Sequence, residues 1–170
     1  KKETPTTLAN PVISTHAGTL ADPIPFGETA EITEKYQDNT AQMQECKLRL
    51  SLISVVRGEA AWKIITKASK ENEQAPAGYE WALAKGKIGV TDLAKDVAYQ
   101  VANSSIPVDT TGVVITQRTA DSIVIPKPEL TGSVQNNQSI SGYFAFVVKT
   151  GEDFLLEYQT TNAQAYFLVK

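Results

Sequence analysis

The chain has 170 residues, of which 42% are hydrophobic and 21% are charged, and 16 basic against 19 acidic residues give a net charge of −3. This length predicts a single domain, and the charged fraction is too low for a disordered chain. The acidic excess argues against nucleic acid as a partner, because phosphates are bound by clustered Lys and Arg. The longest uncharged apolar run, FAFVV, is far shorter than the about 20 residues of a membrane-spanning helix.

The first 19 residues, KKETPTTLANPVISTHAGT, are polar and rich in Thr, and they contain Pro5 and Pro11. We therefore expect residues 1–19 to form a flexible N-terminal tether and residues 20–170 to form one domain. The segment has neither an initiator Met nor the apolar core of a signal peptide. Two interpretations stay open: a signal peptide that has been removed, or a cytosolic chain with an arbitrary first residue.

The first strands are predicted from apolar residues that alternate with polar ones. Residues 23–35 contain one strand, in which Ala30 and Ile32 share a face. The next run, CKLRLSLISVVR, starts at Cys46 and keeps strict alternation until Ile53, where we expect a β-bulge. Cys46 lies on the same face of this strand as the three leucines that follow it, so it is predicted to be a buried and unreactive thiol.

A single helix is predicted over about residues 59–70. Ala61, Ile64, Ile65 and Ala68 recur at the spacing of one helix face and form an apolar stripe. A helix this short is marginally stable by itself, so we expect its apolar stripe to pack against a sheet.

Most of the remaining chain is predicted to form short strands with turns between them. In the strand at 79–91, Ala82, Ala84 and Gly86 leave a trough on one face, which we expect Trp62 or an aromatic residue of the next strand to fill. The segment VQNNQSISG is predicted to be a polar loop. Further strands and hairpins are expected at 97–102, 106–115, 123–126, 143–149, 154–160 and 165–170.

Short strands joined by antiparallel-type turns favour a sandwich over a fold of repeated βαβ units. The predicted fold class is therefore all-β: an antiparallel sandwich with one short inserted helix at about 59–70.

Four stretches of the chain form a pattern: NP at 10–11 or DPIPFGE at 22–28, VVRGEAAW at 55–62, GYEWALAK at 78–85, and ISGYFAF at 140–146. Together they resemble an immunoglobulin-like domain of unknown function found in secreted and lipid-anchored surface lipoproteins of Gram-positive bacteria. The resemblance covers roughly residues 20–170, and the two middle stretches are its most specific part. The family usually has a bulky residue where this chain has Gly86.

The resemblance implies an immunoglobulin-like sandwich outside the membrane, in a family whose members are often tethered through a lipid-modified N-terminal Cys. No such Cys precedes Lys1, so membrane contact is expected only through an N-terminal anchor that has been removed. The family has no established catalytic residues, and the resemblance therefore implies no catalytic residue, no cofactor and no metal in this chain.

The best candidate site is the corner between the strand that ends at Arg57 and the helix, with Glu59, Trp62 and Trp81 as its other members. Arg57 has two expected partners, a carboxylate of the helix or one of the next strand. A structural ion pair at this corner is favoured over ligand binding. Trp62 and Trp81 would suit an aromatic platform for sugar rings, but their positions on periodic faces favour core packing.

No catalytic residue is predicted. His16 is the only histidine and lies in the tether, whereas a Ser-His-Asp or Cys-His device needs a rigidly held histidine. A zinc site would need more His or Cys ligands than the chain contains. Paired carboxylates could still perform acid–base chemistry, but the acidic residues are scattered and none lies in a distinctive motif.

The expected function is that of a non-enzymatic extracellular module, part of a lipoprotein anchored at the cell surface. It would bind an unknown protein or a glycan of the cell envelope through its loops or an exposed strand edge. The alternative is a carbohydrate-binding module for cell-wall glycan that uses exposed aromatic residues. A third hypothesis is an enzyme that uses paired carboxylates, and the sequence does not predict the oligomeric state.

Overall fold

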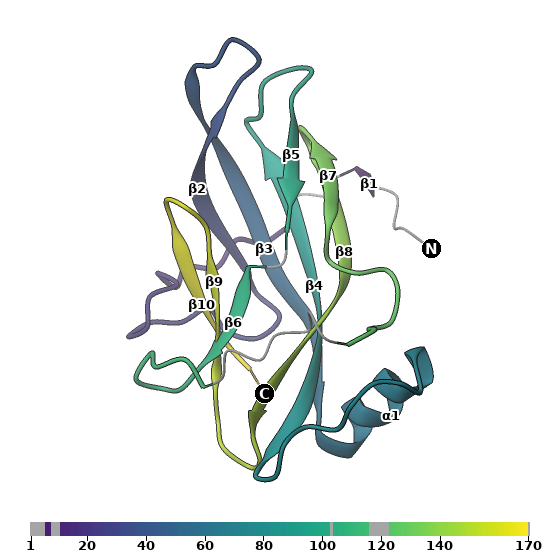
Figure 1. The fold of residues 1–170 in the computed structure, drawn as a ribbon. Helices are drawn as coiled ribbons and strands as arrows, with labels where there is room; N and C mark the ends of the chain where they lie inside the picture. The colour runs from purple at the N-terminus through teal and green to yellow at the C-terminus, as the bar shows by residue number, and fades with distance from the viewer. Residues whose placement is uncertain (1–5, 8–10, 103, 116–122, 170) are drawn as a thin grey trace.

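The computed structural model describes residues 6–7, 11–102, 104–115 and 123–169. Three antiparallel sheets and one short helix make up the fold (Figure 1). The predicted fold class is confirmed, because the structure is an all-β sandwich with a single short helix in the described residues.

The first layer of the sandwich is a five-stranded antiparallel sheet in the order β1-β8-β4-β3-β2. Its register shifts between Leu52 and Ser54, which confirms the bulge predicted at Ile53. The three central strands are long because alternating apolar residues cover a core-facing surface along most of their length. The strands are β1 (Thr6–Thr7), β2 (Thr29–Gln37), β3 (Met43–Arg57), β4 (Tyr79–Thr91) and β8 (Gln138–Lys149).

The opposite layer consists of a three-stranded sheet, β10-β9-β6, and a two-stranded sheet, β5-β7. Both pack on the inner face of the large sheet and share one hydrophobic core with it, which includes Phe144, Leu156 and Phe167. Cys46 is buried in this core, as predicted, and burial raises the pKa of its thiol to about 11. The strands are β5 (Ala98–Val101), β6 (Ser105–Val108), β7 (Gly132–Gln135), β9 (Leu155–Gln159) and β10 (Gln164–Leu168).

Helix α1 (Gly58–Ala68) covers part of the outer face of the large sheet (Figure 1). Ala61 and Ile65 of its apolar stripe are fully buried against Trp81, Leu83 and other residues of β4 and β8. The helix ends two residues before the predicted boundary, because Ser69 adopts an extended conformation. The predicted docking of this short helix on a sheet is confirmed.

The segment VQNNQSISG is not a polar loop, and this prediction was wrong. Val134 and Gln135 end β7, Asn136 and Asn137 form a two-residue turn, and Gln138 begins β8. Asn137 has a φ of 59°, a left-handed conformation that Asn adopts more readily than most residues. The polar residues of this segment therefore make a tight turn instead of ending the sheet.

The trough on β4 is filled from the core side. A side chain at Gly86 would meet Leu130 and Phe144, and Phe144 lies on the neighbouring strand β8. An aromatic residue does fill the trough, but it comes from β8, the neighbour of β4 in the sheet, and not from the strand that follows β4 in the chain, and Trp62 belongs to the helix-side cluster on the other face.

Part of the predicted tether is hydrogen-bonded to the sandwich. The Ser14 amide donates to the Thr29 carbonyl oxygen, and the Tyr166 amide donates to that of Gly18. Residues 11–19 thus lie along β2 and β10, while the flexibility of the tether as a whole stays a prediction.

Candidate functional site

The predicted corner at Arg57 is an ion pair with several further contacts. The Arg57 Nε lies 2.6 Å from Glu80 Oε1 on β4, so the partner comes from the next strand and not from the helix. The guanidinium also donates to the carbonyl oxygens of Lys149 and Glu152, each at 3.0 Å, and lies over the Phe154 ring. These contacts join β3 to β4 and to the turn after β8, which is a structural role.

The other three predicted site residues do not converge with Arg57. Glu59 forms an exposed ion pair with Lys63 one turn along α1. Trp81 is 2% exposed, and its indole N–H donates to the Glu73 carbonyl oxygen at 3.0 Å. Trp62 is partly buried in the same helix-side cluster. Because Trp81 is buried, the two tryptophans do not form an exposed platform for sugar rings.

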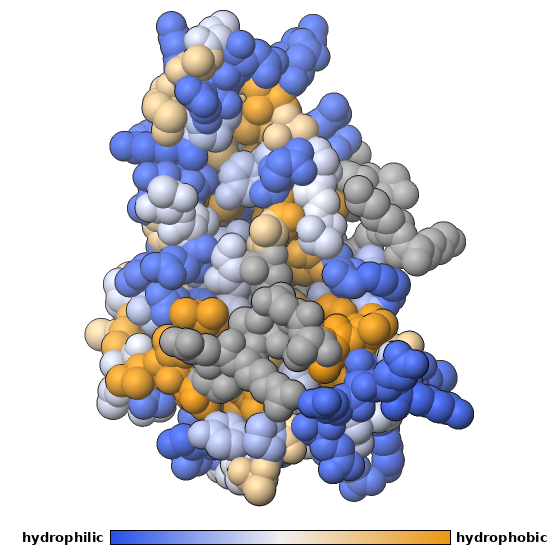
Figure 2. Space-filling view, in the orientation of Figure 1, coloured by the Kyte–Doolittle hydropathy of each residue, from blue (hydrophilic) through white to orange (hydrophobic). Residues whose placement is uncertain are grey.

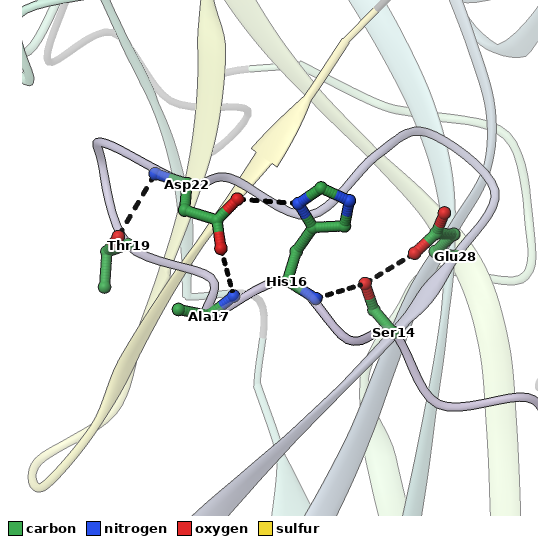
Figure 3. Close-up of polar contacts among 6 residues, drawn as sticks. All are labelled: Ser14, His16, Ala17, Thr19, Asp22 and Glu28. Carbon is green, nitrogen blue, oxygen red and sulfur yellow. Dashed lines mark hydrogen bonds and ion pairs between the residues drawn. The ribbon is translucent and has the colours of Figure 1, made fainter.

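The only histidine of the sequence lies in a small polar cluster of the N-terminal segment (Figure 3). The His16 Nδ1 lies 2.6 Å from Asp22 Oδ1, and the other carboxylate oxygen accepts the Ala17 amide at 2.7 Å. The Ser14 hydroxyl donates to Glu28 and accepts the His16 amide. A Ser-His-Asp relay needs the imidazole bonded to the serine hydroxyl, and here that hydroxyl is bonded to Glu28 instead.

We predict that the contact between His16 and Asp22 makes the docking of this segment depend on pH. The hydrogen bond to Asp22 raises the pKa of His16 above its ordinary value near 6.5. The stability that protonated His16 contributes to the docked segment is fully present below the pKa of His16 in the unfolded chain, and it is lost as the pH rises through the raised pKa of the folded state. The hydrogen bond from the Ala17 amide is the main reason that the pKa of Asp22 is lowered. The stability that ionised Asp22 contributes to the docked segment is therefore lost as the pH falls through that lowered pKa.

An NMR titration of the single imidazole checks this prediction. The pKa of His16 should be above 6.5 in the unmodified chain and should fall toward 6.5 in Asp22→Asn, which keeps the shape but removes the charge. Equal titration curves for the two proteins would show that Asp22 does not hold the ring.

A separate groove with a volume of about 790 Å³ is lined by residues of β2 in the large sheet and of β5, β6 and β9 in the two smaller sheets. These four strands can be followed in Figure 1. Figure 2 shows mostly hydrophilic surface on the upper half of this face, hydrophobic patches just below the middle, and hydrophilic surface again at the lower right and along the bottom edge. The described lining residues are Glu34, Tyr99, Gln100, Ala102, Ser104, Ser105, Ile106, Glu129, Thr131, Tyr158, Gln159, Thr160 and Thr161.

Glu34 is the most unusual residue of this groove. It lies on β2, at the edge of the large sheet, and its side chain points inward with Ala30 and Ile32, so that the residue is only 3% exposed. Its Oε1 accepts a hydrogen bond from the Asn162 side-chain amide at 2.9 Å. Its Oε2 is buried and has no hydrogen-bond partner in the structure. A buried carboxylate oxygen without a donor is costly, so it needs an explanation.

Two tyrosines line the groove beside Glu34. Burial and, to a smaller extent, the charge of Glu34 together raise the pKa of Tyr158 to about 12. Burial also raises the pKa of Tyr99, with smaller contributions from Tyr158, Glu34 and Cys46. Both phenols are therefore neutral at physiological pH and offer an O–H group and an aromatic ring to a ligand.

The charge of the groove is negative. Two carboxylates, Glu34 and Glu129, are among the described lining residues, and these residues include no Lys, Arg or His. Glu129 forms an ion pair with Lys127 outside the lining, which leaves Glu34 as the carboxylate without a cationic partner in the described structure. This arrangement suits binding of a hydrogen-bond donor or a cation.

The part of the chain that the structure describes contains no group of three or more His, Cys, Asp or Glu side chains that could hold a metal ion. A single buried carboxylate with one amide neighbour is also a poor calcium site, since calcium takes six to eight oxygen ligands. The donor set of the groove therefore fits an organic ligand better than a metal ion.

The groove was missed in the sequence, although a signal was present. Ala30 and Ile32 were assigned to one face, and the same period of two places Glu34 on that face as well. An acidic residue at an inward position of an otherwise apolar series indicates either a device against edge-to-edge aggregation or a functional group. No signal in the sequence indicated the roles of Tyr99 and Tyr158 in the groove, and the structure places Tyr158 in the hydrophobic core and Tyr99 partly buried against it.

Comparison with protein-family models, with curated proteins and with solved structures finds no match to this chain. Within the described ranges, no helix has the length and apolar character needed to cross a membrane. The family resemblance and the cellular location therefore stay predictions.

Proposed function

We propose that this chain is a non-enzymatic binding module of the extracellular cell surface and that the groove beside Glu34 is its ligand site. The observation that carries this proposal is the groove itself, whose volume of about 790 Å³ lies in the range of small-molecule sites. It is formed by segments held on a rigid sandwich, as binding sites commonly are. Attachment as a lipoprotein and a location outside a Gram-positive cell belong to the same proposal and come from the family resemblance.

The groove chemistry supports binding more than catalysis. Neutral tyrosines, hydroxyls and amides form most of its polar lining, and these groups recognise ligands without activating them. His16, the only histidine of the sequence, lies in the separate N-terminal cluster with Asp22.

A glycan of the cell wall is the second candidate function, as the ligand of a carbohydrate-binding module. The specific observation in its favour is the set of hydroxyl and amide side chains around two tyrosine rings, which matches the hydroxyls and flat faces of a sugar. The site would then be the groove and not the two tryptophans, because Trp81 is buried.

Co-sedimentation with purified Gram-positive cell walls tests this proposal. Thr161 lines the groove and is exposed, so Thr161→Trp should fill the entrance with little effect on folding. Thr150 is also exposed but lies in the turn after β8, outside the groove, so Thr150→Trp is the matched control. We expect the unmodified chain and Thr150→Trp to sediment with the walls and Thr161→Trp to bind at least about tenfold more weakly, since a blocked pocket loses its central contacts.

Equal binding by all three proteins would show that the groove is not the site. Absence of binding by the unmodified chain, to walls and to the proteins extracted with them, would contradict a function at the cell envelope. Thermal melting of each variant confirms that the substitution has not unfolded the sandwich.

A further inference from the structure

We propose that the groove binds an organic cation through a primary ammonium group, which donates a hydrogen bond to Glu34 Oε2. This inference rests on the proposed function and adds the chemical class of the ligand. It starts from one atom, because Glu34 lines the groove and its Oε2 has no hydrogen-bond donor in the structure.

The position of Glu34 explains why a donor is needed. The residue is 3% exposed, so water hydrates its carboxylate very little. An ionised carboxylate that loses its hydration on burial needs hydrogen-bond donors from elsewhere. Asn162 satisfies one oxygen with a neutral amide, whereas a carboxylate has room for about four hydrogen bonds. An edge strand with an inward charge resists aggregation, but this explanation does not require a groove in front of the charge.

The surrounding charges favour a cation over a neutral donor. Glu129 in the lining is paired with Lys127, so Glu34 is the carboxylate left without a cationic partner, and the described lining residues contribute no positive charge. The rings of Tyr99 and Tyr158 attract a cation through their negative faces, and their phenols stay neutral in this environment. An ammonium group near Glu34 would therefore gain a charge-assisted hydrogen bond in a largely buried site.

The missing hydrogen bond also distinguishes between kinds of cation. A quaternary ammonium ion would interact with the tyrosine rings but has no N–H group for Glu34 Oε2. A divalent metal would find one carboxylate and too few further ligands. The groove of about 790 Å³ leaves space for a polar body attached to the ammonium group, which the hydroxyl and amide side chains would bind.

Titration of the isotope-labelled full chain by NMR tests this inference with three probes that share a two-carbon body. Ethanolamine carries a primary ammonium group, choline replaces its three N–H groups with methyl groups, and ethylene glycol replaces the ammonium with a hydroxyl. We expect ethanolamine to cause saturable shifts at the backbone amides of Glu34, Tyr158 and Asn162, with a dissociation constant of about 1 mM or weaker for so small a fragment. Choline should bind more weakly, and ethylene glycol should not saturate.

Glu34→Gln is the decisive variant, because its amide keeps an oxygen for Asn162 but removes the charge. It should weaken ethanolamine binding by about tenfold or more, which is the usual effect of a lost charge-assisted hydrogen bond. The matched control is Glu129→Gln, in which the removed charge already has Lys127 as a partner, and its effect should be less than about threefold. A titration with sodium chloride at equal ionic strength removes any general effect of salt.

Three results would overturn the inference: no saturable ethanolamine shift near Glu34, equal affinity for ethylene glycol, or saturable binding of calcium chloride in place of ethanolamine. Equal losses in Glu34→Gln and Glu129→Gln would remove Glu34 as the receiving group. Because the probe comparison in the unmodified chain needs no variant, the inference can be rejected even if Glu34→Gln fails to fold. If one of these results is found but Thr161→Trp still abolishes cell-wall binding, the inference fails and the proposed function stands. If ethanolamine binds as expected but the chain does not bind cell walls, only the proposed function is contradicted.

Discussion

Replacing Gly142 with alanine should destabilise the fold by about 3 kcal/mol or more, at the upper end of the effects of overpacking. Gly142 lies in β8, next to Tyr143, which pairs with Glu129 of a neighbouring segment in a parallel bridge. A Cβ atom at position 142 would lie 2.4 Å from the Glu129 carbonyl carbon and oxygen and from the Leu130 nitrogen. These are backbone atoms, and they cannot rotate away as the end of a side chain can.

Two hydrogen bonds hold the segment around Glu129 against β8 next to this glycine. The Tyr143 amide donates to the Pro128 carbonyl oxygen at 2.8 Å, and the Leu130 amide donates to that of Tyr143 at 3.0 Å. An alanine at Gly142 would have to separate the two strands and break these bonds, or distort β8 in the centre of the large sheet. Either response exposes Leu130, which is buried in the core.

Urea denaturation of Gly142→Ala and Gly86→Ala measures this effect with a matched control. Gly86 lies directly opposite Gly142 in the ladder between β4 and β8. Its Cβ would meet Leu130 Cδ2 at 3.1 Å and Phe144 Cε1 at 3.2 Å, which are side-chain atoms that can shift. We expect a loss of about 1 kcal/mol for Gly86→Ala. Equal losses for the two variants would contradict the backbone clash at Gly142.

Trp81→Ala should lower the free energy of unfolding by about 4 kcal/mol, because it leaves a large cavity between α1 and the sheet. Trp81 is 2% exposed and packs in the helix-side cluster with Ala61 and Ile65 of α1. Its indole N–H also bonds the Glu73 carbonyl oxygen, which holds the loop after the helix. Since a helix of 11 residues is marginally stable alone, losing this contact should also release α1.

Chemical denaturation gives the energy, and hydrogen exchange reports whether α1 loses protection before the rest of the fold. Trp81→Phe keeps an aromatic ring but loses the indole hydrogen bond, so its cost should be about 1–2 kcal/mol. Trp62→Ala is the second control, since Trp62 belongs to the same cluster but is only partly buried. If Trp62→Ala cost as much as Trp81→Ala, Trp81 would not be the residue that fixes the helix.

The strand pattern of this protein was predictable where one face of a strand meets the core. The alternation after Cys46, the bulge at Ile53 and the inward face of β9 follow from a side-chain period of two, which is a local property. The helix was predictable for the same reason, with a period of 3.6. The segment VQNNQSISG was misread because a tight turn at Asn136 and Asn137 has the same polar composition as a loop.

The partner of Arg57 shows where this local reasoning stops. Its position at the end of β3 predicted a corner ion pair, but the choice between a carboxylate of the helix and Glu80 depends on how α1 leaves the strand. Glu59 was an equally good candidate for the partner of Arg57, because it is the nearest carboxylate in the sequence. In the structure it pairs with Lys63, one turn further along the helix.

By itself the amino-acid sequence determined the fold class, the position of the helix, most of the inward-facing residues and the burial of Cys46, since all of these follow from periods within a single segment. Only the tertiary structure decided that Glu34, Tyr99 and Tyr158 share a groove, because they come from strands of different sheets that are far apart in the chain. The groove beside Glu34 forms because β2, β5 and β9 pack together from distant parts of the chain, and a local sequence pattern cannot predict such packing.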